Sequence, residues 1–209
     1  MKALILILSS NNSFYPELRQ VQRETFVNDC KTTDWCHAIF YTSKHLATDY
    51  NSDTIYTTCE DTYMKMHAKF KECLSIMDNS VLQFDYIVRI NASTYIDINQ
   101  LKIRLQDLPK EKYYSGYSGG NFASGACFII SSDVAMILAK DIDVQSDLVE
   151  DVEIGRVLMN AGIELVHDDS RCSIYEQAYH DTYNYRCKGL NRPDDDIAVM
   201  RLLNAKPNF

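Results

Sequence analysis

Blocks of apolar and polar residues alternate along the chain, and their lengths predict an alternation of strands and helices. Ala3–Leu8 is a continuous apolar run that ends in four polar residues, Ser9 to Asn12. This is the pattern of a buried parallel strand followed by a loop. Shorter apolar runs predict further strands over residues 37–42, 54–58, 86–90, 126–130 and 163–166.

Apolar residues at helical spacing lie between these strands. They predict helices over residues 15–28, 61–77, 98–105, 133–140, 151–161 and 198–203. Gly162 follows one of these helices at the position where a left-handed backbone is common. The glycine-bearing stretch that precedes residue 126 is predicted to be a loop.

Strands that alternate with helices indicate an α/β three-layer sandwich around a mostly parallel sheet. We expect residues 1–209 to form a single domain, complete in itself or one domain of a longer chain. Ligands of such sheets lie outside the carboxyl ends of the strands. This rule places Ser9–Asn12, Asn91–Thr94 and the residues around Asp151 on one rim.

Charge and cysteine content narrow the classes of function. The formal net charge of −8 disfavours sequence-independent binding to nucleic acid or to an anionic membrane. The seven cysteines are scattered without a CxxC pair, which indicates neither a disulfide framework nor a zinc site. The apolar run at the N-terminus is too short to span a membrane. We therefore expect a reducing, cytoplasmic setting.

Several motifs of common enzyme classes are missing. No GxGxxG follows the first predicted strand, and the chain contains no GxxxxGK[ST], GxSxG or HExxH. Dinucleotide oxidoreductases, P-loop enzymes, α/β-hydrolases and zinc proteases are accordingly disfavoured.

Five stretches remain, in order along residues 3–166: ELRQVQRETF, EDTYMKMHAKF, FDYIVRINASTYIDINQL, YYSGYSGG with SGACFIISSDVA, and EDVEIGRVLMNAGI. Together they resemble GT-A fold glycosyltransferases, especially the β1,3-galactosyl- and N-acetylglucosaminyltransferase and Fringe group. The first stretch is similar to R-x-x-x-R-x-T-W, the second to D-S-Y-x-N-L-T-x-K and the last to E-D-V-x-x-G-x-x-L-x-x-L-G-I. The matching positions in the first two stretches are Arg19, Arg23, Thr25, Phe26, Asp61, Tyr63 and Lys69.

The resemblance implies a GT-A fold enzyme that transfers a sugar from a UDP-sugar to a glycan or glycoprotein hydroxyl, with inversion. It also implies a Mn²⁺ or Mg²⁺ cofactor, and thus UDP binding that Mn²⁺ strengthens. The chain looks most like the free-standing cytoplasmic enzymes of bacteria and large algal viruses, which glycosylate surface polysaccharide or capsid protein. We expect no nucleic-acid partner and no membrane span.

One stretch departs from the family pattern. Asn91-Ala92-Ser93 stands where the family has Asp-x-Asp, the carboxylates that hold Mn²⁺ against the diphosphate. Asn and Ser oxygens can bind a hard cation, but without the charge that makes such sites tight. Two interpretations stay open: contact with the donor through water or sugar hydroxyls, and a turn closed by side-chain to backbone bonds.

The resemblance implies a role for further residues. The donor is expected against Ser9, Ser10, Asn11, Arg19, Arg23, Asp61, Arg89, Asn91 and Ser93. The acceptor is expected against Tyr114, Tyr117, Gly119, Gly120, Ser124 and Gly125. His180 and His167 are the candidate metal ligands, although a lone His is more often structural.

The stretch HDTYNYRCKGLNR offers positive charge for a diphosphate, from His180, Arg186, Lys188 and Arg192. The competing interpretation is a solvated basic stretch that balances Asp194 to Asp196.

Glu150 and Asp151 are the candidate catalytic pair, with Asp151 preferred. Family position implies that this carboxylate faces the acceptor hydroxyl and removes its proton. Acidic residues at a helix start are also explained by capping and by the helix dipole.

Two other functions remain open. One is a non-catalytic sugar or nucleotide-sugar binding domain with a degenerate Asp-x-Asp motif. The other is a nucleotidyltransferase, which is disfavoured because no glycine-rich loop with Arg or Lys follows the first predicted strand.

Overall fold

A seven-stranded sheet forms the centre of the protein. The computed structural model describes residues 1–209 except 46, 48–49, 174–181 and 206–209. The strands lie in the order β3-β2-β1-β4-β7-β6-β8. They are β1 (Ala3–Leu8), β2 (Cys36–Ser43), β3 (Thr54–Thr57), β4 (Tyr86–Asn91), β6 (Tyr114–Ser118), β7 (Ala123–Ser131) and β8 (Val166–His167).

The sheet is mostly parallel, which confirms the predicted fold class. β1 pairs in parallel with both β2 and β4, whereas β7 runs antiparallel to its neighbours β4 and β6. A second, three-stranded sheet has the order β5-β10-β9. Its strands are β5 (Thr94–Ile96), β9 (Arg171–Ser173) and β10 (Asn184–Arg186). β5 follows β4 after a short turn, so the two sheets meet at the carboxyl end of β4.

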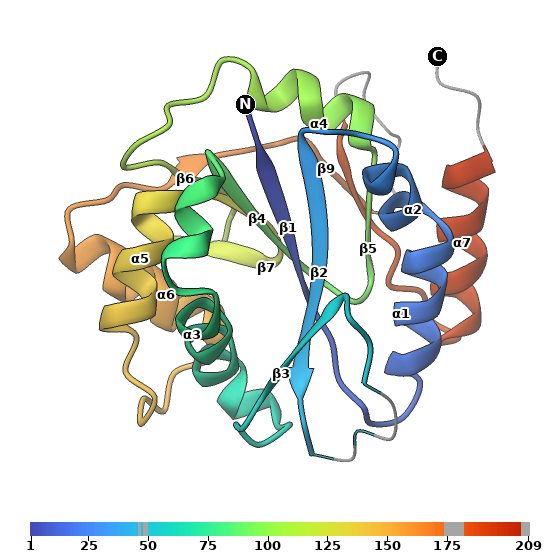
Figure 1. The fold of residues 1–209 in the computed structure, drawn as a ribbon, viewed down its shortest axis with the longest axis horizontal. Helices are drawn as coiled ribbons and strands as arrows, with labels where there is room; N and C mark the ends of the chain where they lie inside the picture. Colours follow the sequence, from blue (N-terminus) through green and yellow to red (C-terminus); the bar gives the residue numbers. More distant parts are fainter. Residues whose placement is uncertain (46, 48–49, 174–181, 206–209) are drawn as a thin grey trace.

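Helices cover both faces of the central sheet (Figure 1). One face carries α1 (Tyr15–Glu24), α2 (Phe26–Lys31), α4 (Ile98–Leu105) and α7 (Asp194–Ala205). The other face carries α3 (Met66–Met77), α5 (Ser132–Asp141) and α6 (Glu150–Asn160). Two short 3₁₀ helices, η1 (Tyr63–Lys65) and η2 (Asp78–Gln83), lie at the two ends of α3.

The continuous apolar run of β1 follows from this layering. Ala3, Ile5 and Ile7 pack into the core under α1 and α2, and the intervening leucines pack into the core on the other face. A strand covered on both faces has no solvent side, so its sequence shows no polar alternation. The structure confirms the predicted bounds of this strand to the residue.

The predicted helix over residues 15–28 is wrong in one respect, because Thr25 divides it into α1 and α2. Thr25 is non-helical, with φ −110° and ψ −121°. Its hydroxyl donates to the carbonyl of Val21 at 2.8 Å and so competes with the helical hydrogen-bond pattern.

The loop predicted before residue 126 is also wrong, because residues 114–118 form β6 and β7 begins at Ala123. Gly116 lies within β6, where the close approach of β7 leaves no room for a side chain. A Cβ atom at this position would lie 2.7 Å from the Cβ of Ala123 and 3.2 Å from that of Phe128. The strand predicted over residues 163–166 is wrong except at its last residue, because β8 spans only Val166–His167 and pairs in parallel with β6 at the edge of the sheet.

Gly162 has the predicted left-handed backbone, with φ +71°. The six cysteines whose side chains are described are all free thiols. None of the helices in the described part of the chain is long and apolar enough to cross a membrane.

Candidate active site

A pocket of about 460 Å³ lies at the carboxyl ends of β1 and β4. Its walls come from the loop after β1, the turn after β4, the start of β7, the first turn of α6 and the segment between β10 and α7. The predicted site residues that line it are Ser9, Ser10, Asp61, Arg89, Asn91, Ser93, Ser124, Gly125, Glu150, Asp151, Arg186 and Lys188. The rim predicted from the strand ends is therefore where these side chains meet.

Asp61 fixes the loop after β1. Its Oδ2 atom accepts hydrogen bonds from the Ser10 hydroxyl at 2.6 Å and from the backbone N–H of Asn11 at 3.1 Å. Lys69 forms a buried ion pair with the other carboxylate oxygen. Burial would raise the pKa of Asp61, but the hydrogen bonds from Lys69 and Ser10 outweigh it and hold the pKa below its ordinary value. Asp61 is thus a charged anchor for the loop.

Arg19 supports the same loop from outside the pocket. It donates to the Ser9 hydroxyl at 3.1 Å, to the Ser10 carbonyl at 3.2 Å and to the Asn11 side-chain oxygen at 3.3 Å. Asn11 in turn donates to the carbonyl of Ser43 at 2.7 Å. The side chains of Arg19 and Asn11, both predicted to bind the donor, therefore shape the loop and are not among the pocket-lining residues.

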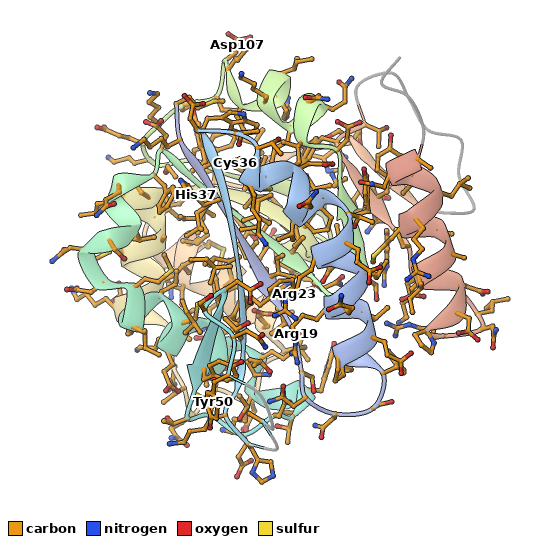
Figure 2. All side chains as sticks on the ribbon, turned by 45° about the vertical axis from the view of Figure 1, so that its right-hand side comes forward. Arg19, Arg23, Cys36, His37, Tyr50 and Asp107 are labelled. Carbon is orange, nitrogen blue, oxygen red and sulfur yellow. The ribbon has the colours of Figure 1, made fainter. Side chains whose placement is uncertain are left out.

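Arg23 lies away from the pocket, although it was predicted to bind the donor. Its guanidinium makes two 2.8 Å hydrogen bonds to the carboxylate of Asp53 and stacks 4.9 Å from the centre of the Phe40 ring. Figure 2 shows Arg19 and Arg23 together on the side of α1 that faces β2. Arg23 therefore belongs to the contact between α1 and the β2–β3 edge.

The turn after β4 is closed by its own side chains. The Asn91 Oδ1 atom accepts from the backbone N–H of Ser93 and from the hydroxyl of Thr94, both at 3.0 Å. The Ser93 hydroxyl accepts from the Arg192 guanidinium at 2.6 Å. The side-chain oxygen of Asn91 therefore closes the turn, as one of the two interpretations predicted. Asn91 and Ser93 nevertheless both line the pocket.

These residues do not fit a directly coordinated metal ion. The oxygens of Asn91 and Ser93 are neutral and already accept hydrogen bonds from the protein. No group of three or more His, Cys, Asp or Glu side chains within the described ranges is arranged to hold a metal. His180 lies outside the described residues.

His167 is placed at the edge of the sheet, in β8, and is not among the pocket-lining residues. Its Nδ1 accepts from the backbone N–H of Ser118 at 3.1 Å, and its Nε2 contacts the carboxylate of Asp169. Both ring nitrogens are thus engaged outside the pocket, which does not agree with the predicted role as a metal ligand.

Arg89 and Glu150 form a buried ion pair in the pocket floor, and each is 1% exposed. Arg89 also donates to the hydroxyl of Tyr41 at 3.1 Å and to the carbonyl of Gly125. Burial would lower the pKa of Arg89, but the neighbouring charge of Glu150 outweighs it and raises the pKa above the ordinary value. Arg89 is therefore always charged, and the Glu150 carboxylate is occupied by its ion pair with Arg89.

Asp151 is the more accessible of the two adjacent carboxylates. It lies in the first turn of α6, and its Oδ2 accepts from the backbone N–H of Gly125 at 2.8 Å. A Cβ atom on Gly125 would lie 2.3 Å from the Asp151 Oδ1 atom and 3.0 Å from Arg89. Only glycine leaves room for this carboxylate. Asp151 is half-buried and lines the pocket, whereas Glu150 is 1% exposed.

A basic segment closes the pocket beside the turn after β4. Arg186 in β10 pairs with Thr94 in β5, and the backbone N–H of Cys187 donates to the Ser93 carbonyl at 2.7 Å. Arg186, Lys188 and Arg192 all line the pocket. The acidic residues that follow neutralise this segment only in part, through Asp196, whose carboxylate lies 3.1 Å from Arg192.

The predicted acceptor residues separate into two groups. Ser124 and Gly125 line the pocket, whereas Tyr114 is buried in the core, where its hydroxyl accepts from the backbone N–H of Ala123 at 2.7 Å. Tyr117, Gly119 and Gly120 lie on the surface, and none is among the pocket-lining residues. An acceptor role for Tyr114 is contradicted by its burial.

The sequence interpretation gave no role in the site to two residues that the site contains or contacts, Lys69 and Arg171. Lys69 matched a family motif, so a signal for it existed. Arg171 carried no such signal, whereas Arg192 was already part of the basic stretch predicted to face the diphosphate. Arg171 stacks 3.8 Å from the ring centre of Tyr117 and donates to the Ser124 hydroxyl at 3.4 Å.

Neither the scan against protein families nor the search of curated proteins gives a match. Solved structures do match. A glycosyltransferase involved in glycosylation of the major capsid of PBCV-1 has a TM-score of 0.57 at 13% identity, over 95% of this chain and 99% of that one. A Drosophila β1,4-galactosyltransferase 7 variant in complex with manganese, UDP-Gal and xylobiose has 0.51 at 9% identity, over 100% and 77%.

A putative glucose-1-phosphate thymidylyltransferase from Bacillus anthracis is also similar, with a TM-score of 0.52 at 13% identity over 100% of this chain and 98% of that one. Such low identities carry the fold and not the activity. The resemblance to the β1,3-galactosyl and Fringe group therefore stays a prediction. With its mostly parallel seven-stranded sheet between two helical layers, the chain has the GT-A fold of the glycosyltransferases it matches.

Proposed function

We propose that the chain is a glycosyltransferase that moves a sugar from a UDP-sugar to a hydroxyl group of a glycan or glycoprotein, with inversion. One observation carries the proposal. The pocket presents the carboxylate of Asp151, held by the Gly125 N–H, in the same cavity as the basic residues Arg186 and Lys188. A base and an anion-binding wall in one pocket are what transfer from a nucleotide diphosphate requires.

In the proposed reaction, Asp151 takes the proton of the acceptor hydroxyl. The hydroxyl oxygen forms a bond to the anomeric carbon while the bond from that carbon to the UDP oxygen breaks. Attack from the face opposite UDP inverts the configuration. Gly125 holds Oδ2 of Asp151 in place, which orients the carboxylate for proton transfer. Arg186 and Lys188 stabilise the negative charge of the departing UDP.

We place the uridine against the loop after β1, where Ser9, Ser10 and Asp61 line the pocket together with Tyr15, an aromatic side chain of suitable shape for a base. The sugar would lie near Asn91 and Asp151, and the acceptor near Ser124 and Gly125. The capsid-glycosylating neighbour supports a cytoplasmic enzyme with a capsid or surface glycan as acceptor. The described residues do not form a Mn²⁺ or Mg²⁺ site, so no step is routed through a metal.

Two alternatives predict different outcomes. A non-catalytic binding domain is not favoured, because the pocket contains a half-buried, oriented carboxylate in addition to its anion-binding groups. A nucleotidyltransferase is supported by the thymidylyltransferase of similar fold. However, the loop after β1 here is Ser-Ser-Asn-Asn, which has no glycine or basic residue for a nucleoside triphosphate.

The proposal is tested by screening UDP-sugars for release of UDP, in the absence of acceptor and with added glycan acceptors. One UDP-sugar should be hydrolysed slowly alone and turned over faster with acceptor. Formation of pyrophosphate from a nucleoside triphosphate and a sugar 1-phosphate would instead identify a nucleotidyltransferase. UDP-sugar binding without any turnover would favour the binding domain.

Gly125→Ala is expected to slow glycosyl transfer by displacing Asp151. The added methyl group would overlap Asp151, because a Cβ atom on the present backbone would lie 2.3 Å from the Asp151 Oδ1 atom. Displacement of a catalytic group by about 1 Å typically costs on the order of 10²-fold in rate. We expect kcat to fall by about this factor while UDP affinity changes little.

Gly162→Ala is the control for this variant. Gly162 follows α6, does not line the pocket and has no atom within 4 Å of an added Cβ, but its φ of +71° is unfavourable for alanine. The control should therefore lower the melting temperature and leave kcat unchanged. Equal losses of kcat in the two variants would show that Gly125→Ala acts through stability and not through Asp151.

A further inference from the structure

We propose that the diphosphate of the donor is neutralised by Arg186, Lys188 and Arg192 in place of a divalent cation, so that the protein binds UDP without metal. This inference rests on the proposed function and makes it more specific. It also reverses the expectation, implied by the motif resemblance, that Mn²⁺ strengthens UDP binding. The geometry of the turn after β4 carries the argument.

The basic segment lies directly beside the turn in which the family places its metal carboxylates. β10 pairs with β5, which brings Arg186 opposite Thr94. The Cys187 N–H donates to the Ser93 carbonyl at 2.7 Å, and the Arg192 guanidinium donates to the Ser93 hydroxyl at 2.6 Å. Backbone and side-chain contacts thus hold positive groups against the turn after β4.

The side-chain oxygens of the turn are neutral and already accept hydrogen bonds from the protein. The Asn91 oxygen is used twice within the turn, and the Ser93 hydroxyl oxygen accepts from Arg192. A dication bound at Ser93 would also lie beside the positively charged guanidinium of Arg192, which is an unfavourable arrangement. Charge repulsion and occupied oxygens therefore both oppose metal binding at this turn.

The ionisable groups of the pocket leave a positive surplus on the basic segment. Asp61 is paired with Lys69, Glu150 with Arg89, and Asp196 with Arg192. The remaining carboxylate of the pocket, Asp151, lies at the start of α6 and not on the basic segment. Within the part of the chain that the structure describes, no ion pair joins Arg186 or Lys188 to a carboxylate. These two side chains line the pocket and have charge to contribute to a bound diphosphate. A protein of net charge −8 that retains such a surplus at one wall is suited to bind an anion there.

Arg192 is held in position before any ligand binds. Its Nε atom lies 3.1 Å from the buried carboxylate of Asp196, its guanidinium stacks 4.6 Å from the ring centre of Phe14, and Nη2 donates to Ser93. A guanidinium has five N–H donors in a rigid plane, which match two phosphate oxygens at once. These contacts use two of the donors and orient the group at the pocket wall.

The test is calorimetric titration of the intact protein with UDP, in buffer with EDTA and in buffer with Mn²⁺. We expect UDP to bind in EDTA with the same affinity as in Mn²⁺. Arg186→Gln and Lys188→Gln should each lower the affinity in EDTA by about 10-fold or more, since each removes a charge-assisted contact to phosphate. Lys140→Gln, an exposed lysine of α5 that does not line the pocket, is the matched control and should bind UDP normally. Thermal melting of each variant shows that it is folded.

Asn91→Asp provides an independent measurement. The carboxylate keeps an oxygen for the hydrogen bonds from Ser93 and Thr94 and adds one negative charge. If positive side chains bind the diphosphate, the variant should bind UDP more weakly in both buffers. If the turn is a degenerate metal site, it should instead gain affinity for UDP in Mn²⁺.

The outcomes separate this inference from the proposed function. Two results would contradict neutralisation of the diphosphate by the three basic residues: loss of wild-type UDP binding in EDTA, or a gain in Mn²⁺-dependent UDP affinity in Asn91→Asp. Neither result would contradict the proposed glycosyltransferase activity. Failure of UDP to bind in either buffer would remove the proposed donor and this inference together. Equal binding in the two buffers with loss in both basic-residue variants is the result that we expect.

Discussion

Replacement of Asp151 by Asn is expected to abolish glycosyl transfer while UDP binding stays nearly unchanged. The amide keeps the size of the side chain and an oxygen that accepts from the Gly125 N–H, but it cannot take a proton from the acceptor. Loss of a general base costs about 10²–10⁴-fold in rate. The measurement is kcat with acceptor, together with the Kd of UDP.

The control for this variant is Asp147→Asn, which removes an exposed carboxylate just before α6 that does not line the pocket. It should retain full activity. If folded Asp151→Asn protein kept near-normal kcat, Asp151 would act only at the start of the helix, and Glu150 would become the next candidate base.

The sequence predicted the central strands well because burial on both faces leaves an unambiguous apolar signal. β1 is the clearest case, since both helical layers pack on it. β6 was missed because its Ser, Gly and Tyr composition resembles a loop. Its identity as a strand depends on the close approach of Gly116 to Ala123 and Phe128, a tertiary contact that no local pattern reveals.

Family motifs located the site without giving the role of each residue. In the stretch ELRQVQRETF, Arg19 supports the loop after β1, Thr25 ends α1, and Phe26 is buried in the core. These positions maintain the architecture around the pocket. A motif match thus located the correct region, but only the structure separates pocket-lining residues from their supports.

The sequence placed Arg192 in a basic stretch but could not predict its hydrogen bond to Ser93, which joins positions 99 residues apart. Arg186 and Lys188 were found only as part of a basic stretch, with neutralisation by Asp194 to Asp196 as a competing interpretation. In the structure, Asp196 is directed to Arg192 and to the Gly189 N–H. Which cations stay available to a ligand is decided by tertiary pairing and not by composition.

The second large effect is expected for stability, from the buried pair of Arg89 and Glu150. Arg89→Leu would leave the Glu150 carboxylate buried without its partner, along with the Gly125 carbonyl and the Tyr41 hydroxyl. Breaking a buried pair in this way costs about 3–5 kcal/mol of unfolding free energy. Urea denaturation of the variant should show a loss of this size, whereas Arg201→Leu, which breaks an exposed and solvent-screened pair with Glu24, should leave the free energy of unfolding nearly unchanged.

The double variant Arg89→Leu with Glu150→Leu distinguishes a structural pair from a catalytic one. Because no unpaired charge remains in the interior, the double variant should recover much of the stability that the single variant loses. Burial already raises the pKa of Glu150, with the charge of Arg89 opposing that rise, so removal of Arg89 alone should raise this pKa further. The folded pKa then lies above the unfolded one, and protonation of Glu150 at lower pH should restore part of the lost stability. A double variant no more stable than Arg89→Leu at any pH would show that the loss comes from packing and hydrogen bonds, and that the unpaired charge of Glu150 contributes nothing.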